Sequence, residues 1–118
     1  MPSHLLNFTE REEMKAQVIN EIYDGIDEAV KNWANTQEHE DGLIIWPKGE
    51  DHLASHIKDY LIDDGLEAFS EMNLRHERAD FRKISRQIQR EQWDQIKITD
   101  EVISHILQYA ILGEAVYE

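Results

Sequence analysis

The sequence predicts an all-α fold, a single-domain bundle of four to five helices with one long loop around residues 35–50. Two observations carry this prediction. Apolar residues recur at spacings of three and four along most of the chain, which is the period of a helix with one buried face. Proline and glycine, which disfavour helix interiors, are absent from residues 66–112. With 118 residues, 41% of them hydrophobic, the chain can build one core, so we expect a single domain over 1–118.

The first helix is expected to begin at Thr9, because Thr9 and Glu12 have the spacing of a capping box. Apolar residues at helical spacing then define one face for about six turns. They are Met14, Val18, Ile19, Ile22, Tyr23, Ile26, Val30 and Trp33.

The loop around residues 35–50 has a charged first half and an apolar second half. Its apolar run, Leu43-Ile44-Ile45-Trp46, precedes Pro47, and periodicity alone does not separate a short extended segment from a loop that packs into the core. We expect the packed loop.

Three further helical regions follow. A second helix is expected from a cap at Asp51 to Asp63-Asp64-Gly65. Residues 66–97 predict either one long helix or two in series, with the break near Met72-Asn73-Leu74. The last helix is expected to begin at a cap at Thr99 or Asp100 and to end before Gly113.

The chain is strongly acidic, because 25 Asp and Glu residues oppose 12 Lys and Arg residues and give a formal net charge of −13. The charge is uneven: residues 35–71 carry −8, whereas residues 74–97 carry +3. Such asymmetry is informative about partners and electrostatic steering. A continuous helix over 74–97 would place its basic residues in one sector beside the apolar face. The arginines that we assign to this sector are Arg75, Arg78, Arg82, Arg86 and Arg90.

The acidic surface predicts a protein-binding module that binds, and thereby inhibits, a basic nucleic-acid-binding protein or enzyme complex. Fixed carboxylates can imitate the phosphates of nucleic acid and occupy a basic cleft. Trp46 is the candidate apolar anchor, since buried aromatic side chains often dominate binding energy. The alternative interpretation of the charge is solubility. The candidate acidic residues are Glu38, Glu40, Asp41, Asp51, Asp59, Asp63, Asp64, Glu67 and Glu71.

In length and charge the chain is similar to small acidic helical inhibitors, such as phage-encoded DNA mimics and the immunity proteins of nuclease toxins. This similarity lies in composition and assigns no role to any residue.

A second hypothesis is a dimeric regulator that contacts nucleic acid through the basic helix 75–97. Residues 102–117 would form the homodimer interface, because the last helix carries apolar residues on nearly every side. The same pattern also fits a helix at the centre of the bundle.

A third hypothesis is a small metal-dependent enzyme around His52 and His56. Two histidines one turn apart on a helix can bind zinc, and Asp59 and Asp63 would continue their stripe. The alternative is that both are ordinary histidines at the flank of a helix. The sequence holds no cysteine, no glycine-rich phosphate loop and no Gly-x-Ser-x-Gly motif. We therefore expect no metal, no cofactor and no enzymatic activity.

Location and membrane association follow from composition. The absence of cysteine is compatible with a reducing compartment. The first residues lack the basic and apolar regions of a secretory signal. The longest stretch without Asp, Glu, Lys or Arg is residues 102–113, 12 residues, against about 20 needed to span a bilayer. We expect a cytoplasmic protein without a membrane anchor.

Overall fold

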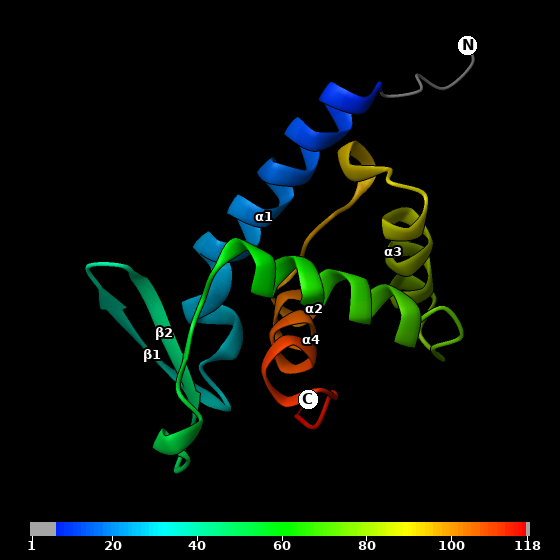
Figure 1. Cartoon of the computed structure of the whole chain (residues 1–118). Coiled ribbons are helices and arrows are strands. Elements are labelled where there is room, and N and C mark those ends of the chain that lie inside the picture. Colours follow the sequence, from blue (N-terminus) through cyan, green and yellow to red (C-terminus); the bar gives the residue numbers. More distant parts are fainter. Residues whose placement is uncertain (1–6, 118) are drawn as a thin grey trace.

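A computed structural model of the chain describes residues 7–117 (Figure 1). They form four α-helices, a three-stranded antiparallel sheet and two short 3₁₀ helices, so the all-α prediction is wrong. The chain order is α1 (Phe8–Val30), β1 (Ala34–His39), β2 (Gly42–Pro47), η1 (Asp51–Leu53), β3 (Ser55–His56), α2 (Asp59–Met72), α3 (Ala79–Gln89), η2 (Trp93–Gln95) and α4 (Asp100–Leu112).

Helix α1 begins at a capping box, although at an earlier residue than predicted. The Asn7 side chain accepts a hydrogen bond from the Glu10 amide at 2.8 Å, and the Glu10 carboxylate accepts from the Asn7 amide at 3.3 Å. Asn7 and Glu10 have the same spacing as Thr9 and Glu12, and asparagine is a better N-cap than threonine. One apolar face is buried as expected, at Val18, Ile22, Ile26 and Val30.

The segment predicted as a packed loop is a β-hairpin, which adds an unexpected sheet. Strands β1 and β2 pair in register from Ala34 opposite Pro47 to His39 opposite Gly42, and β3 pairs with the other side of β2. Gly42 has φ 122° directly after the turn, a conformation that favours glycine. Alternate β2 residues are buried, but Ile44 and Trp46 are half-buried on the opposite face. Because β2 carries apolar residues on both faces, the alternation of a strand is hidden in its sequence.

The helix predicted over residues 51–65 is also wrong at both ends. Backbone pairing draws this segment into the sheet, since Ile44 pairs with His56 and the Ile57 amide donates to the Leu43 carbonyl at 2.8 Å. Helix α2 therefore begins only at Asp59 and then continues to Met72.

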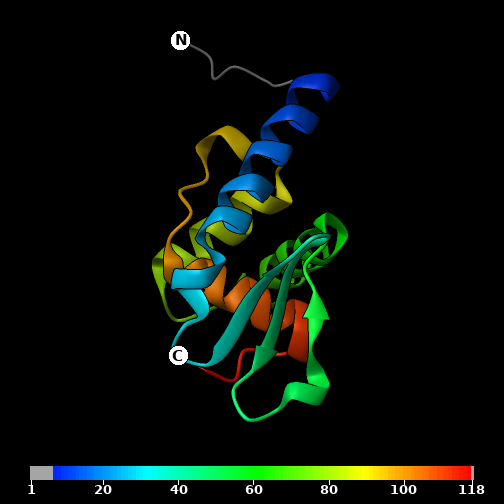
Figure 2. The ribbon, with the colours of Figure 1, turned by 90° about the vertical axis from the view of Figure 1, so that its left-hand side faces the viewer.

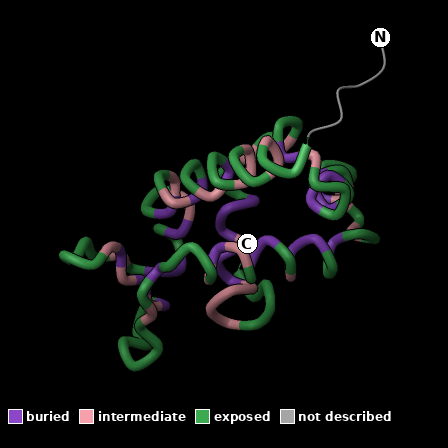
Figure 3. Tube along the Cα trace, turned by 45° about the horizontal axis from the view of Figure 1, so that its top comes forward, coloured by how far each residue is buried: buried purple, intermediate pink, exposed green. Residues whose placement is uncertain are grey.

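Gly65 lies inside α2, where it permits a close approach of α4. A Cβ atom at this position would lie 2.5 Å from the Ile106 carbonyl oxygen. Helix α4 packs against both α1 and α2, and Figure 3 shows buried residues concentrated where these helices meet. This central place explains the apolar residues around α4, while dimerisation through residues 102–117 stays a prediction.

The predicted ends of α4 are confirmed. The Thr99 hydroxyl accepts from the Val102 amide at 3.3 Å, and Gly113 follows the helix in the left-handed region at φ 80°. Of the two alternatives for residues 66–97, the structure has two helices with the break at the predicted place, because α2 ends at Met72 and Asn73 caps it. A continuous helix over 74–97 is wrong: α3 spans only Ala79–Gln89.

The segment after α4 folds back onto the turn between α1 and β1, as Figure 2 shows. The buried Gln108 side chain accepts from the amides of Val116 and Tyr117, both at 2.7 Å, and donates to the Tyr117 carbonyl at 3.0 Å. The Tyr117 ring stacks on Trp33 with the centroids 5.4 Å apart. This contact fastens the C-terminal segment to the core. Among the described residues, none of the helices combines the length and the apolar composition that crossing a membrane requires.

Candidate functional site: an acidic groove along α2

Helix α2 presents a line of carboxylates on its outer side. Its inner residues, such as Ile62, Leu66 and Phe69, are buried. Residues four apart lie about one turn and about 6 Å from one another along a helix. Four predicted acidic residues have this spacing and share one side of the helix: Asp59, Asp63, Glu67 and Glu71. The remaining acidic residue of the prediction on this helix, Asp64, is exposed beside them.

Two adjoining hollows lie beside this line, and together we call them the α2 groove. The first, about 210 Å³, lies between α1 and the start of α2 and is lined by Glu12, Lys15, Asp59 and Asp63. The second, about 300 Å³, continues along α2 towards α3 and η2. Its lining includes Lys15, Asp63, Glu67, Glu71, Glu91 and Trp93.

Lys15 lies where the two hollows meet. Its ammonium group is 2.7 Å from the Asp63 carboxylate and 5.6 Å from the centre of the Trp93 ring. A carboxylate and the face of an indole both attract a cation. The α2 groove thus already accommodates one ammonium group, which belongs to the chain itself.

The charge balance of the α2 groove is strongly negative. Six carboxylates line it, whereas Lys15 is the one cation among its lining residues within the described part of the chain. Glu91 also forms an ion pair with Arg11 at 3.4 Å, and the Glu91 side chain is 57% exposed. The groove is therefore suited to Lys and Arg side chains of another molecule.

The other predicted acidic residues lie near the sheet. Glu38, Glu40 and Asp41 are exposed at the tip of the hairpin, and Asp51 is exposed in η1. Lys58, which precedes α2, donates to the Asp41 carbonyl at 3.4 Å. This contact brings the hairpin tip close to the beginning of α2.

The tryptophan that lines the α2 groove is not the one that the sequence predicts as an anchor. Trp46, the predicted anchor, is half-buried on the outer face of the sheet and does not line the α2 groove. Trp93 does line it, together with Glu12 and Lys15 of α1 and Glu91 after α3. Sequence reasoning missed these residues, because the groove joins segments that no local pattern connects. The nearest signal of the groove in the sequence is Trp93, because a helical wheel over residues 74–97 places this aromatic residue away from the apolar face.

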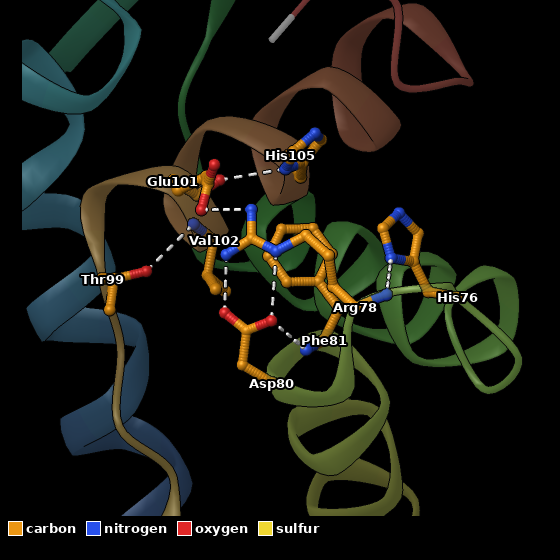
Figure 4. Close-up of polar contacts among 8 residues, drawn as sticks. All are labelled: His76, Arg78, Asp80, Phe81, Thr99, Glu101, Val102 and His105. Carbon is orange, nitrogen blue, oxygen red and sulfur yellow. Dashed lines mark hydrogen bonds and ion pairs between the residues drawn. The ribbon is translucent and has the colours of Figure 1, made fainter.

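The predicted basic sector is split between structural and free arginines. Arg78 contacts Asp80 at 2.6 Å and Glu101 at 2.5 Å, and its guanidinium lies 4.4 Å from the centre of the Phe81 ring (Figure 4). Arg82 donates to the carbonyls of His76 and Glu77 at 2.6 and 2.9 Å. Both arginines therefore hold the turn between α2 and α3 and its junction with α4.

The remaining arginines of this sector point to solvent. Arg75, Arg86 and Arg90 are exposed, as is Lys83, and among the residues that the structure describes none of the four has an ion-pair partner. These cations remain available for an external anion.

Besides Arg78, whose pKa is raised by its hydrogen bonds to Asp80 and Glu101, two groups at the junction of α3 and α4 have shifted pKa values. Hydrogen bonding from Arg78 lowers the pKa of Asp80, with the Arg78 charge acting in the same direction. Burial lowers the pKa of His105, and this outweighs its contact with the Glu101 carbonyl at 3.1 Å, which acts in the opposite direction. Both shifts belong to the contacting residues Arg78, Asp80, Phe81, Glu101 and His105, which we call the Arg78 cluster, and not to the α2 groove.

The predicted histidine stripe is wrong, because its residues lie on different elements. His52 is in η1, His56 is in β3 and Asp59 begins α2. The His56 ring instead faces His39 across the sheet, with the ring centroids 6.0 Å apart. Within residues 7–117, no group of three or more His, Asp or Glu side chains is arranged to hold a metal ion.

Comparison with known proteins gives no match: no protein-family model, no curated protein and no solved structure is similar to this chain. Any function must therefore be argued from the geometry.

Proposed function

We propose that this chain is a non-enzymatic protein-binding module that holds a basic segment of another protein in the α2 groove. The observation that carries the proposal is the six carboxylates that line the groove against Lys15. A lysine or arginine side chain of the partner would lie beside Lys15, against the other carboxylates that line the groove, such as Glu67 and Glu71. Association would be fast and salt-sensitive, because opposite charges steer the encounter.

The expected target is a protein whose basic cleft ordinarily binds nucleic acid. Such a cleft presents several Lys and Arg side chains along the path of a phosphate backbone. Helix α2 offers a carboxylate about every 6 Å in a fixed line. Occupation of the cleft would exclude the nucleic acid, so the module would act as an inhibitor.

Replacing three groove carboxylates tests the proposal directly. Asp59→Asn, Glu67→Gln and Glu71→Gln remove three charges but leave the ion pair between Asp63 and Lys15 in place. The matched control combines Glu21→Gln, Asp24→Asn and Glu114→Gln, which removes three charges from exposed positions outside the groove.

The binding of a fluorescent oligo-arginine peptide is measured by anisotropy at low and at high salt. We expect the groove variant to bind about tenfold more weakly than the control, with a smaller dependence on salt. Equal weakening of both variants would mean that net charge alone, and not the α2 groove, attracts the peptide.

A second candidate function rests on the exposed cations of α3. Arg86 and Arg90 lie one turn apart, are exposed and have no ion pair among the described residues. They could contact phosphates of a nucleic acid. Reversal of both to Glu should abolish retention of the protein on immobilised nucleic acid at low salt. If the unaltered protein is not retained, this function is excluded.

A further inference from the structure

The outer side of β1 leaves backbone hydrogen-bonding groups open. The sheet order is β1-β2-β3, so β1 forms an edge. The Lys48 amide donates to the Trp33 carbonyl at 3.0 Å, which continues the ladder one residue before the strand. In an antiparallel pair, alternate residues face the partner strand. Gln37 and His39 thus face β2, whereas Thr36 and Glu38 turn their N–H and C=O groups outward.

Apart from the charge of Glu38, this edge lacks most of the features that usually block an edge strand. Natural sheets protect such strands with charged side chains, above all lysine, with proline, a bulge or a covering element. The strand Ala34–His39 contains no lysine or proline, and its six residues pair with β2 without a bulge. The Thr36 hydroxyl donates to Asp27 of α1 at 2.5 Å, which fixes the strand without using its outward backbone groups.

Charge selects what can pair with this edge. Residues 34–47 carry three carboxylates and neither Lys nor Arg. Glu38 lies on the edge strand itself, and Glu40 and Asp41 form the turn beside it. A second copy of the chain would bring the same acidic strand and a net charge of −13, so self-pairing is opposed by repulsion.

We infer that an extended segment rich in Lys or Arg adds to the sheet as a fourth strand along the outer edge of β1. Its backbone would exchange hydrogen bonds with Thr36 and Glu38, and a cationic side chain would lie near Glu38. This inference rests on the proposed function, because it assigns the basic partner a form and a second contact. The α2 groove would bind charged side chains, whereas the β1 edge would recognise an extended backbone.

A synthetic peptide of alternating lysine and valine probes this edge, with amide hydrogen exchange as the readout. We expect the Thr36 and Glu38 amides to become at least about tenfold more protected on binding, while the Gln37 and His39 amides, which face β2, change little. The same peptide with every second backbone nitrogen methylated cannot form the ladder along one edge, so it should bind about tenfold more weakly.

Two substitutions of Thr36 separate the contribution of its backbone N–H to peptide binding from that of its side chain. Thr36→Pro removes the outward N–H, which proline tolerates at an edge. Thr36→Val keeps that N–H and loses only the bond to Asp27. We expect Thr36→Pro to weaken peptide binding about tenfold relative to Thr36→Val. If circular dichroism shows that Thr36→Pro does not fold, the methylated peptide decides the question.

The outcomes distinguish this inference from the proposed function. Binding of the lysine–valine peptide without protection of Thr36 and Glu38, and with sensitivity to the α2 groove substitutions, overturns the edge and leaves the groove standing. Protection of the same amides in the free protein as its concentration rises assigns the edge to a second copy and overturns the inference. Failure of both the lysine–valine and the oligo-arginine peptides to bind overturns both proposals.

Discussion

Helices α2 and α3 are neighbours with opposite charge, and they use that charge in different ways. They touch through a hydrogen bond of 3.0 Å from the Gln89 side chain to the Ser70 hydroxyl. On α2, Asp63 forms an ion pair, and the other four predicted carboxylates of the helix have no ion pair among the described residues. At the start of α3, Arg78 and Arg82 are occupied by internal contacts. Charge on α2 is therefore available to a partner, whereas part of the charge on α3 stabilises the fold.

The largest expected effect concerns the surface that holds α2 in place. Gly65→Ala would put a methyl group 2.5 Å from the Ile106 carbonyl oxygen, and backbone cannot yield as a side chain can. We expect the free energy of unfolding to fall by about 3 kcal/mol, measured by urea titration.

Gly25→Ala is the matched control for this substitution. Its methyl group would lie 2.8 Å from the Ile103 Cδ1 atom, the mobile end of a side chain. A gain in helix propensity offsets that contact, so we expect a change within about 1 kcal/mol. If both variants lose the same stability, the close approach of α2 and α4 at Gly65 is not what fixes the acidic helix.

The second prediction separates structural from free arginines. Arg82→Met removes two charge-assisted hydrogen bonds to the carbonyls of His76 and Glu77, so we expect a loss of about 1–2 kcal/mol of unfolding free energy. Arg86→Met alters an exposed residue of the same helix and should change stability by less than about 0.5 kcal/mol. Thermal or urea unfolding of the two variants compares them. Equal losses would contradict the division of the basic sector.

The third prediction concerns the one lysine that lines the α2 groove within the described residues. Lys15→Met removes the cation from the α2 groove and frees the Asp63 carboxylate, so oligo-arginine should bind about threefold more tightly at low salt. Lys48→Met makes the same change in net charge at an exposed residue after β2. Anisotropy titrations of both variants give the comparison. A gain of equal size for Lys48→Met would show that the position of the charge does not matter.

The contrast between α2 and α3 also shows how far sequence reasoning reaches. The buried face of α1, the break after Met72 and both ends of α4 follow from local signals, namely apolar spacing and capping residues. These signals depend on neighbours within a few residues, which is why they succeed.

The failures have non-local causes. Gly65 resembles the end of a helix, and only the approach of Ile106 from another helix explains why α2 continues through it. The apolar residues of β2 resemble a core segment, because the sheet leaves Ile44 and Trp46 partly covered on its outer face. The sequence predicts the acidic residues of α2, but the groove that includes Glu12 and Glu91 requires the packing of α1 and η2 against α2.

The smallest expected effect is a pH dependence at the junction of α3 and α4. Burial beside Phe81 lowers the pKa of His105, with the charges of His76 and Arg78 acting in the same direction and Glu101 opposing them. The unfolded state then binds a proton more readily than the folded state. His105 costs no stability above its ordinary pKa of about 6.5, and stability is lost as the pH falls from there through the lowered folded pKa.

Replacement of His105 shows how much of the pH dependence of the unfolding free energy it causes. His105→Gln should lose less unfolding free energy than the unaltered chain between about pH 7.5 and about pH 5.5, measured by urea titration at each pH. His52→Gln removes an exposed histidine of η1 and serves as the control. The loss of stability in mild acid would then arise from protonation of His105 in the Arg78 cluster, and the carboxylates of α2 need not contribute to it. If His52→Gln flattens the pH dependence as much as His105→Gln does, burial at the α3–α4 junction is not its source.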